Sequence, residues 1–151
     1  MAGLGQEVGG DHTAAQETWR QARSELELFL KEQPENSLLI GDLALTNMGL
    51  GDKATALALA ERGMALRPIE QDALEGSARI ESLARVAAGT GEPDRAIAAL
   101  QKLLSIPSAG VVASVAITPA LLRLDPMFDP LRNDPRFQKL ATSSASKPAD
   151  K

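Results

Sequence analysis

The sequence has no cysteine and no tyrosine, and it contains one tryptophan, three phenylalanines and one histidine among 151 residues. The lack of cysteine excludes disulfide bonds and thiolate metal sites, and one histidine is too few for an imidazole cluster, so we expect no metal site. Because aromatic residues make up only 3% of the chain, the core must be built from alanine, leucine, isoleucine and valine. Such a composition suits closely packed helices better than sheets.

An excess of basic residues is also missing. The chain has 16 basic and 20 acidic residues and a pI near 5.0, which argues against a nucleic-acid-binding surface. Residues 1–10 lack the basic and apolar regions of a signal peptide. Residues 103–122 carry no charge over a length that could span a membrane, but Pro107 and Pro119 interrupt them. We therefore expect no membrane span. We expect a cytoplasmic location, with the periplasm as the alternative if the parent protein has a membrane span.

Catalytic motifs are absent as well. The glycines in residues 3–10 do not have the spacing of a phosphate-binding loop, and no Gly-Lys-Ser/Thr sequence follows them. His12 is the only histidine, so it has no second imidazole with which to bind a metal ion. The signature sequences of protein kinases and serine hydrolases do not occur. We therefore expect neither enzymatic activity nor a cofactor.

One short pattern occurs three times: a glycine, an acidic residue, three variable residues and an alanine. The glycines are 41 and 40 residues apart, and a stretch rich in alanine and leucine follows each of them. A fixed period of this size is typical of arrays of helical hairpins, in which neighbouring units bury each other's apolar faces. Such arrays form a concave binding surface and rarely catalyse reactions. The three copies are Gly10-Asp11-x-x-x-Ala15, Gly51-Asp52-x-x-x-Ala56 and Gly91-Glu92-x-x-x-Ala96.

Apolar spacing and the positions of glycine and proline predict five long helices. They cover residues 11–33, 38–50, 53–67, about 80–88 and 93–106, with residues 69–76 as a connector that Gly76 interrupts. Further on, Thr-Pro and Asp-Pro pairs predict short helices, since a side-chain acceptor followed by proline suits the start of a helix. These short helices cover residues 119–124, 130–132 and 135–140.

The middle unit resembles a tetratricopeptide repeat (TPR) in the positions of its large, small and turn residues. The third unit matches with Leu83, Gly91-Glu92, Ala96, Leu100 and Leu103, and the first unit keeps only the second helix of a hairpin. HEAT-type repeats are the alternative, because their native period is about 40–47 residues. The residues that carry the resemblance in the middle unit are Leu43, Gly51, Asp52, Ala56, Ala60, Gly63 and Pro68.

The TPR resemblance implies an all-α solenoid of about two and a half helical hairpins, closed by short C-terminal capping helices. Residues 124–140 are similar to the chain endings of bacterial multidomain signalling proteins, in which the array follows a Ser/Thr kinase, a nucleotide cyclase or a winged-helix domain. We divide the chain into a flexible N-terminus (1–10), the repeats (11–107), a capping segment (108–141) and a disordered tail (142–151).

The resemblance also implies which residues face the groove. TPRs that bind a peptide's terminal carboxylate use lysine and asparagine where this chain has Gly41 and Leu45, so that role is not implied here. Glu81 and Arg85 are four residues apart, and the alternative to a groove position is an ordinary ion pair along one helix. The small residues Gly41, Ala78 and Ala88 occupy the other groove-facing positions of the same two helices. The candidate groove residues are Leu38, Leu45, Met48, Glu81 and Arg85.

We expect the chain to bind or scaffold a protein or peptide partner within a signalling or regulatory protein. The alternative is a sensor domain that binds a small molecule and regulates an attached effector domain. No helix precedes Gly10 to complete the first hairpin, so we expect the chain to be incomplete at its start. The uncovered face of the first unit, around Trp19, would then favour self-association. A core position is the alternative for Trp19, the only tryptophan.

Overall fold

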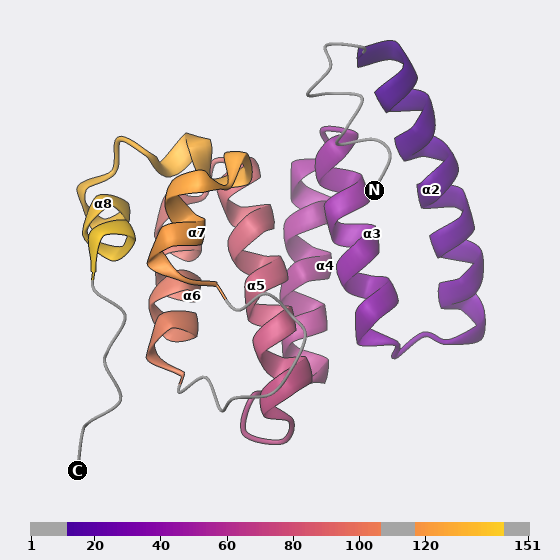
Figure 1. The fold of residues 1–151 in the computed structure, drawn as a ribbon. Helices are drawn as coiled ribbons and strands as arrows, with labels where there is room; N and C mark the ends of the chain where they lie inside the picture. Colours follow the sequence, from indigo (N-terminus) through magenta and orange to yellow (C-terminus); the bar gives the residue numbers. More distant parts are fainter. Residues whose placement is uncertain (1–11, 107–116, 144–151) are drawn as a thin grey trace.

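The computed structural model describes residues 12–106 and 117–143, and in these residues the secondary structure is helical, without a strand. The all-α class predicted from composition is therefore confirmed. Figure 1 shows the helices side by side in a row, from α2 at one end to the C-terminal helices at the other. The elements are α2 (His12–Glu32), α3 (Ser37–Gly49), α4 (Lys53–Leu66), α5 (Ala73–Gly89), α6 (Pro93–Ser105), α7 (Pro119–Leu124), the 3₁₀ helix η1 (Pro126–Leu131) and α8 (Pro135–Thr142).

Two copies of the repeated pattern form the turns between paired helices. Gly51 and Gly91 have φ angles of 81° and 79°, in the left-handed region that glycine adopts without strain. The Asp52 carboxylate accepts a hydrogen bond of 3.2 Å from the Thr55 amide and so caps α4. The chain thus forms two helical hairpins, α3–α4 and α5–α6. Gly10 and Asp11 of the first copy lie outside the described residues together with the predicted flexible N-terminus, and Ala15 of that copy is fully buried in α2.

The prediction for the start of α5 was wrong. Residues 73–79 are helical, because the Asp72 carboxylate accepts hydrogen bonds from the amides of Leu74 (3.0 Å) and Glu75 (2.9 Å). Gly76 lies inside the helix and does not interrupt it. A Cβ at this position would lie 2.6 Å from the Cα of Ile69, so the glycine permits a close backbone approach.

The core has two parts that share α5. Small residues dominate where α3, α4 and α5 meet, and Ala56 is fully buried there. Large residues dominate between α5, α6 and the C-terminal helices, where Phe128 and Phe137 lie 6.1 Å apart between ring centroids. The predicted aliphatic core therefore holds for the middle of the molecule, and two of the three phenylalanines lie at its C-terminal end.

The C-terminal helices, which we call the cap (residues 117–143), begin at side-chain acceptors followed by proline, as predicted. Thr118, Asp125 and Asp134 accept hydrogen bonds from backbone amides at the starts of α7, η1 and α8. The predicted helix over residues 130–132 is wrong: η1 begins four residues earlier, at Pro126, and Pro130 lies inside it. Helix α8 extends to Thr142, which had been assigned to the tail. Residues 144–151 lie outside the described residues.

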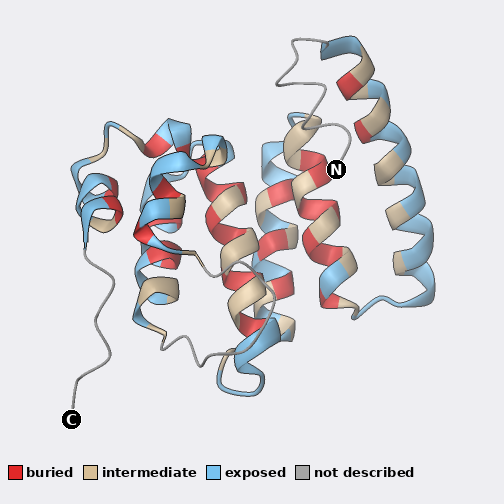
Figure 2. Cartoon of the chain, in the orientation of Figure 1, coloured by how far each residue is buried: buried red, intermediate tan, exposed pale blue. Residues whose placement is uncertain are grey.

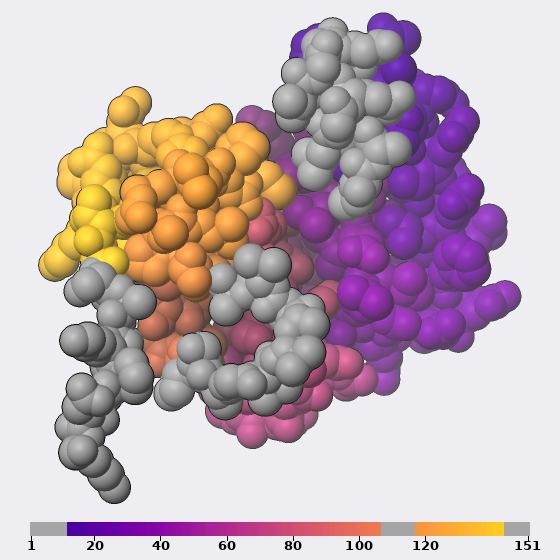
Figure 3. Space-filling model, in the orientation of Figure 1, coloured from indigo at the N-terminus to yellow at the C-terminus, as the bar shows by residue number. Residues whose placement is uncertain are grey.

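Helix α2 packs on α3 mainly through its N-terminal half. Trp19 is 1% exposed and its ring lies against Gly49, so the structure favours the core position for this residue. Further along α2, Leu28 and Phe29 are 62% and 54% exposed. In Figure 2 the buried residues of α2 are confined to one half of the helix, whereas α3 and α5 carry them along their length. Helix α2 and the cap lie at opposite ends of the molecule (Figure 3).

Candidate functional site

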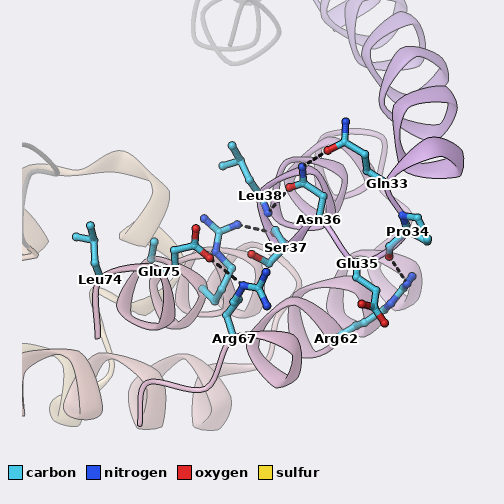
Figure 4. Close-up of a pocket in the computed structure, with 12 residues that line it drawn as sticks. Gln33, Pro34, Glu35, Asn36, Ser37, Leu38, Arg62, Arg67, Leu74 and Glu75 are labelled. Atoms are coloured by element: carbon cyan, nitrogen blue, oxygen red, sulfur yellow. Dashed lines mark hydrogen bonds and ion pairs between the residues drawn. The ribbon is translucent and has the colours of Figure 1, made fainter. Parts of the chain in front are cut away.

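A surface groove with a volume of about 1000 Å³ lies where three helix ends meet (Figure 4). The α2–α3 loop and the start of α3 form one side, and the end of α4 and the start of α5 form the other. The groove is open to solvent along one side. Its lining consists of residues 33–38, Arg62, Arg67, Leu74, Glu75, Ala78 and Arg79.

The α2–α3 loop is fixed by hydrogen bonds at both of its sides. Asn36 accepts bonds from the amides of Leu38 (3.1 Å) and Leu39 (3.2 Å), which caps the N-terminus of α3. Arg62 of α4 donates a bond of 2.6 Å to the carbonyl oxygen of Pro34. This rim of the groove is therefore held in place by neighbouring helices.

The opposite rim is held by an ion pair between α4 and α5. The Nε atom of Arg67 lies 3.0 Å from a carboxylate oxygen of Glu75, and both side chains are about half exposed. An exposed pair of this kind adds little stability, about 0–1 kcal/mol. For the groove, the consequence is that Arg67 and Glu75 together add no net charge.

Arg79 is the most unusual residue of the groove, because it is a charged side chain with only 8% exposure. Its Nη1 atom donates a hydrogen bond of 2.6 Å to the carbonyl oxygen of Ser37. Within the described part of the chain, no carboxylate lies within 4 Å of its guanidinium, and its Nε atom is buried without a hydrogen-bond partner. Burying a cation without a counter-ion costs free energy. An anion that contacts this guanidinium would therefore be bound favourably.

Gly41 makes room for the end of the Arg79 side chain, whereas a side chain at Gly63 would be in ordinary contact with it. A Cβ at Gly41 of α3 would lie 2.6 Å from Nη1, and one at Gly63 of α4 would lie 3.8 Å from Cδ. The negative charge of Asp42 on α3 interacts with this guanidinium. Burial raises the pKa of Asp42, and the positive charge of Arg79 opposes this rise without cancelling it.

Two exposed leucines line the same groove as Arg79. Leu38 at the start of α3 is 57% exposed, and Leu74 at the start of α5 is 60% exposed. Both line the groove, and Figure 4 shows them on its α3 and α5 sides. The site therefore combines apolar contact area with one uncompensated positive charge.

The candidate residues from the sequence do not all meet in this groove. Leu38 and Ala78 line it. Leu45 and Met48 are half-buried further along α3, where they pack against the α3–α4–α5 part of the core. The groove role predicted for those two residues stays a prediction.

Glu81 and Arg85 instead hold the cap. Arg85 lies 2.9 Å from Glu81 and 2.6 Å from Asp125, and its guanidinium carbon is 5.2 Å from the centre of the Phe128 ring. Burial alone would lower the pKa of Arg85, but the bonds and charges of Asp125 and Glu81 outweigh it and raise that pKa. Arg85 is therefore paired within the fold and is not the solvent-facing groove residue that was expected. The alternative prediction for Glu81 and Arg85, an ion pair along one helix, is seen in the structure.

Of the twelve residues that line the groove, the sequence analysis named only Leu38 and Ala78 as groove positions. The residues that it missed include Arg62, Arg67, Leu74 and Arg79. Leu74 was missed because residues 69–76 were interpreted as a connector. Gly41 was a usable signal for Arg79, since a glycine inside α3 leaves space for the end of a long side chain from a neighbouring helix.

No protein-family model matches the chain, and no curated protein or solved structure matches it either. No cluster of three or more histidine or acidic side chains that could hold a metal ion occurs in residues 12–106 and 117–143. Over the same ranges, no helix combines the length and the apolar character needed to cross a membrane.

Proposed function

We propose that this chain is a TPR-like solenoid of about two and a half repeats that binds a protein or peptide partner within a signalling or regulatory protein. The two hairpins α3–α4 and α5–α6 support the TPR-like arrangement, because both turn at a glycine with positive φ followed by an acidic residue. The first repeat is then represented by α2 alone.

The observation that carries the proposal is the open groove with two exposed leucines on different helices. Because both leucines line the same groove, they offer a partner apolar contact area that a single exposed leucine elsewhere on the surface does not. A groove that is open along one side suits an extended or helical polypeptide better than a small molecule, which is usually enclosed on most of its surface. The protein-binding function is therefore preferred over the small-molecule sensor.

A peptide-library selection against the full chain tests this function. Selected peptides are expected to bind the wild-type chain and to lose at least tenfold in affinity for the double variant Leu38→Asp/Leu74→Asp. Burial of a leucine side chain contributes about 1.5–3 kcal/mol, which corresponds to tenfold or more.

Leu28→Asp is the matched control, because Leu28 is equally exposed but lies on α2, outside the groove. It is expected to bind the selected peptides as the wild type does. Peptides that respond only to Leu28→Asp would place the binding surface on α2 and overturn the groove assignment.

A further inference from the structure

The charges around the groove are not balanced. Three arginines and two glutamates line it, and the Arg67–Glu75 ion pair neutralises one of each. Figure 4 shows Glu35 and Arg62 together at one end of the groove, with Leu74 at the other. Arg79 is left with a carbonyl oxygen as its hydrogen-bond acceptor, and the residue as a whole is 8% exposed.

The helix ends add to this positive potential. The N-termini of α3 and α5, at Ser37 and Leu74, both line the groove. The first turn of a helix carries a partial positive charge and favours anions. The α3 dipole and the buried guanidinium therefore favour negative charge at the same place, whereas the Asp72 carboxylate that caps α5 already offsets the dipole of that helix.

We propose, on the basis of the protein-binding function above, that the partner segment of this groove is acidic. In this arrangement an aspartate or glutamate of the partner bonds the Arg79 guanidinium, and apolar side chains on either side of it contact Leu38 and Leu74. The Coulomb attraction and the new hydrogen bonds supply the counter-ion that the folded chain lacks. A carboxylate suits the site better than a phosphate group, since Glu35, which also lines the groove, repels a second negative charge.

Four capped tripeptides test the proposal by NMR titration of the uniformly ¹⁵N-labelled full chain. The probes are N-acetyl-Leu-X-Leu-amide with glutamate, glutamine, lysine or phosphoserine at X. The glutamate peptide is expected to shift the amide signals of residues 36–41 and 74–79 and to bind about tenfold more tightly than the glutamine peptide, as expected for one charge-assisted hydrogen bond. Its affinity should fall with added salt.

Two variants identify Arg79 as the residue responsible. Arg79→Met removes the charge, and Gly41→Ala keeps every charge but places a Cβ 2.6 Å from Nη1, which displaces the guanidinium. Both are expected to bind the glutamate and glutamine peptides equally. The matched control is Arg95→Met, since Arg95 is an exposed arginine in an ion pair between α4 and α6, away from the groove. It should keep the tenfold preference.

The outcomes separate this inference from the proposed function. Equal binding of the glutamate and glutamine peptides in the groove of the wild type would overturn the acidic partner and leave the peptide-binding function standing. Tighter binding of the phosphoserine peptide would overturn the carboxylate in favour of a phosphorylated partner. If none of the peptides shifts the groove amides at millimolar concentration, both proposals fail.

Discussion

Two arginines of α5, six residues apart, meet opposite electrostatic conditions. Arg85 is 16% exposed in its side chain and has two carboxylates within 2.9 Å, one of them from the cap. Arg79 is 8% exposed and has no carboxylate within 4 Å in the described ranges. The same helix therefore places one arginine where the chain supplies its counter-ion and another where it does not.

The difference shows which end of α5 has a structural role and which end is available for binding. At the C-terminal half, the Arg85–Asp125 pair joins residues 40 positions apart and secures η1 against the helix. At the N-terminal half, Arg79 lies at the bottom of an open groove. Charges that the fold compensates are expected to affect stability, and charges that it leaves uncompensated are expected to affect binding.

The largest expected effect follows from Arg85→Met, which leaves the carboxylates of Glu81 and Asp125 without their counter-ion in a partly buried place. Removing one member of a buried pair costs about 3 kcal/mol or more. We expect urea denaturation of the variant to show a loss of that size. Arg95→Met is the control, because its exposed pair with Glu61 is worth less than about 1 kcal/mol. Equal losses in the two variants would contradict a structural role specific to Arg85.

A smaller loss is expected from Gly76→Ala at the groove end of α5. The new Cβ would lie 2.6 Å from the Cα of Ile69, and because backbone atoms cannot move aside freely, we expect a cost of about 1–3 kcal/mol by thermal or urea denaturation. Gly63→Ala is the matched control: its Cβ would be 3.5 Å from its nearest neighbour, an ordinary contact. That variant should be neutral or up to about 1 kcal/mol more stable, since alanine is the better helix former. A stable Gly76→Ala protein would mean that α5 does not approach Ile69 this closely.

Arg79→Met tests the comparison directly, because it makes the same chemical change as Arg85→Met six residues away. Here the variant loses one hydrogen bond to a carbonyl oxygen but no longer buries an uncompensated charge. Replacing a poorly compensated buried charge by an apolar side chain of similar length is often neutral or stabilising. We expect the free energy of unfolding to change by less than about 1 kcal/mol in urea denaturation. A loss as large as that of Arg85→Met would show that Arg79 is needed for folding.

Local signals in the sequence predicted much of the fold. Gly51 and Gly91 mark the hairpin turns, since a left-handed turn residue leaves a recognisable glycine. The Thr-Pro and Asp-Pro pairs mark the starts of the cap helices, because capping involves residues that are close in sequence. Leu38 lines the groove at the helix ends, but its predicted role on the concave face of a repeat array stays a prediction.

The non-local features could not be predicted in the same way. Whether Arg79 or Arg85 obtains a counter-ion depends on where the cap folds back, and Asp125 lies 40 residues from Arg85 in the sequence. The depth of Arg79 depends on the packing of α3 and α4 around it, which Gly41 permits but does not specify on its own. Periodicity identifies the face of a helix, but not which charges on that face meet an opposite charge.

The smallest expected effect concerns Asp42, the negative charge that acts on Arg79 from α3. Burial raises the pKa of Asp42 above its usual value of 3.8, so its ionised form destabilises the folded state above the folded-state pKa. This penalty shrinks as the pH falls through 3.8, because the residue becomes protonated in the unfolded state as well. Asp42→Asn is therefore expected to raise stability at pH 7 by less than about 1 kcal/mol, given solvent screening of this half-exposed group, and to have a smaller effect near pH 3.5.

Urea denaturation of the Asp42→Asn variant at the two pH values measures this difference, with Glu70→Gln, an exposed acidic residue, as the control. The variant also removes the one negative charge that partly offsets Arg79, so the glutamate tripeptide should bind it more tightly than it binds the wild type. A stability gain that is the same at pH 3.5 and pH 7 would show that the charge of Asp42 is not the cause. An unchanged affinity for the glutamate peptide would show that Asp42 does not compete with the acidic partner for Arg79, and the contrast between the two arginines would then rest on Arg85 alone.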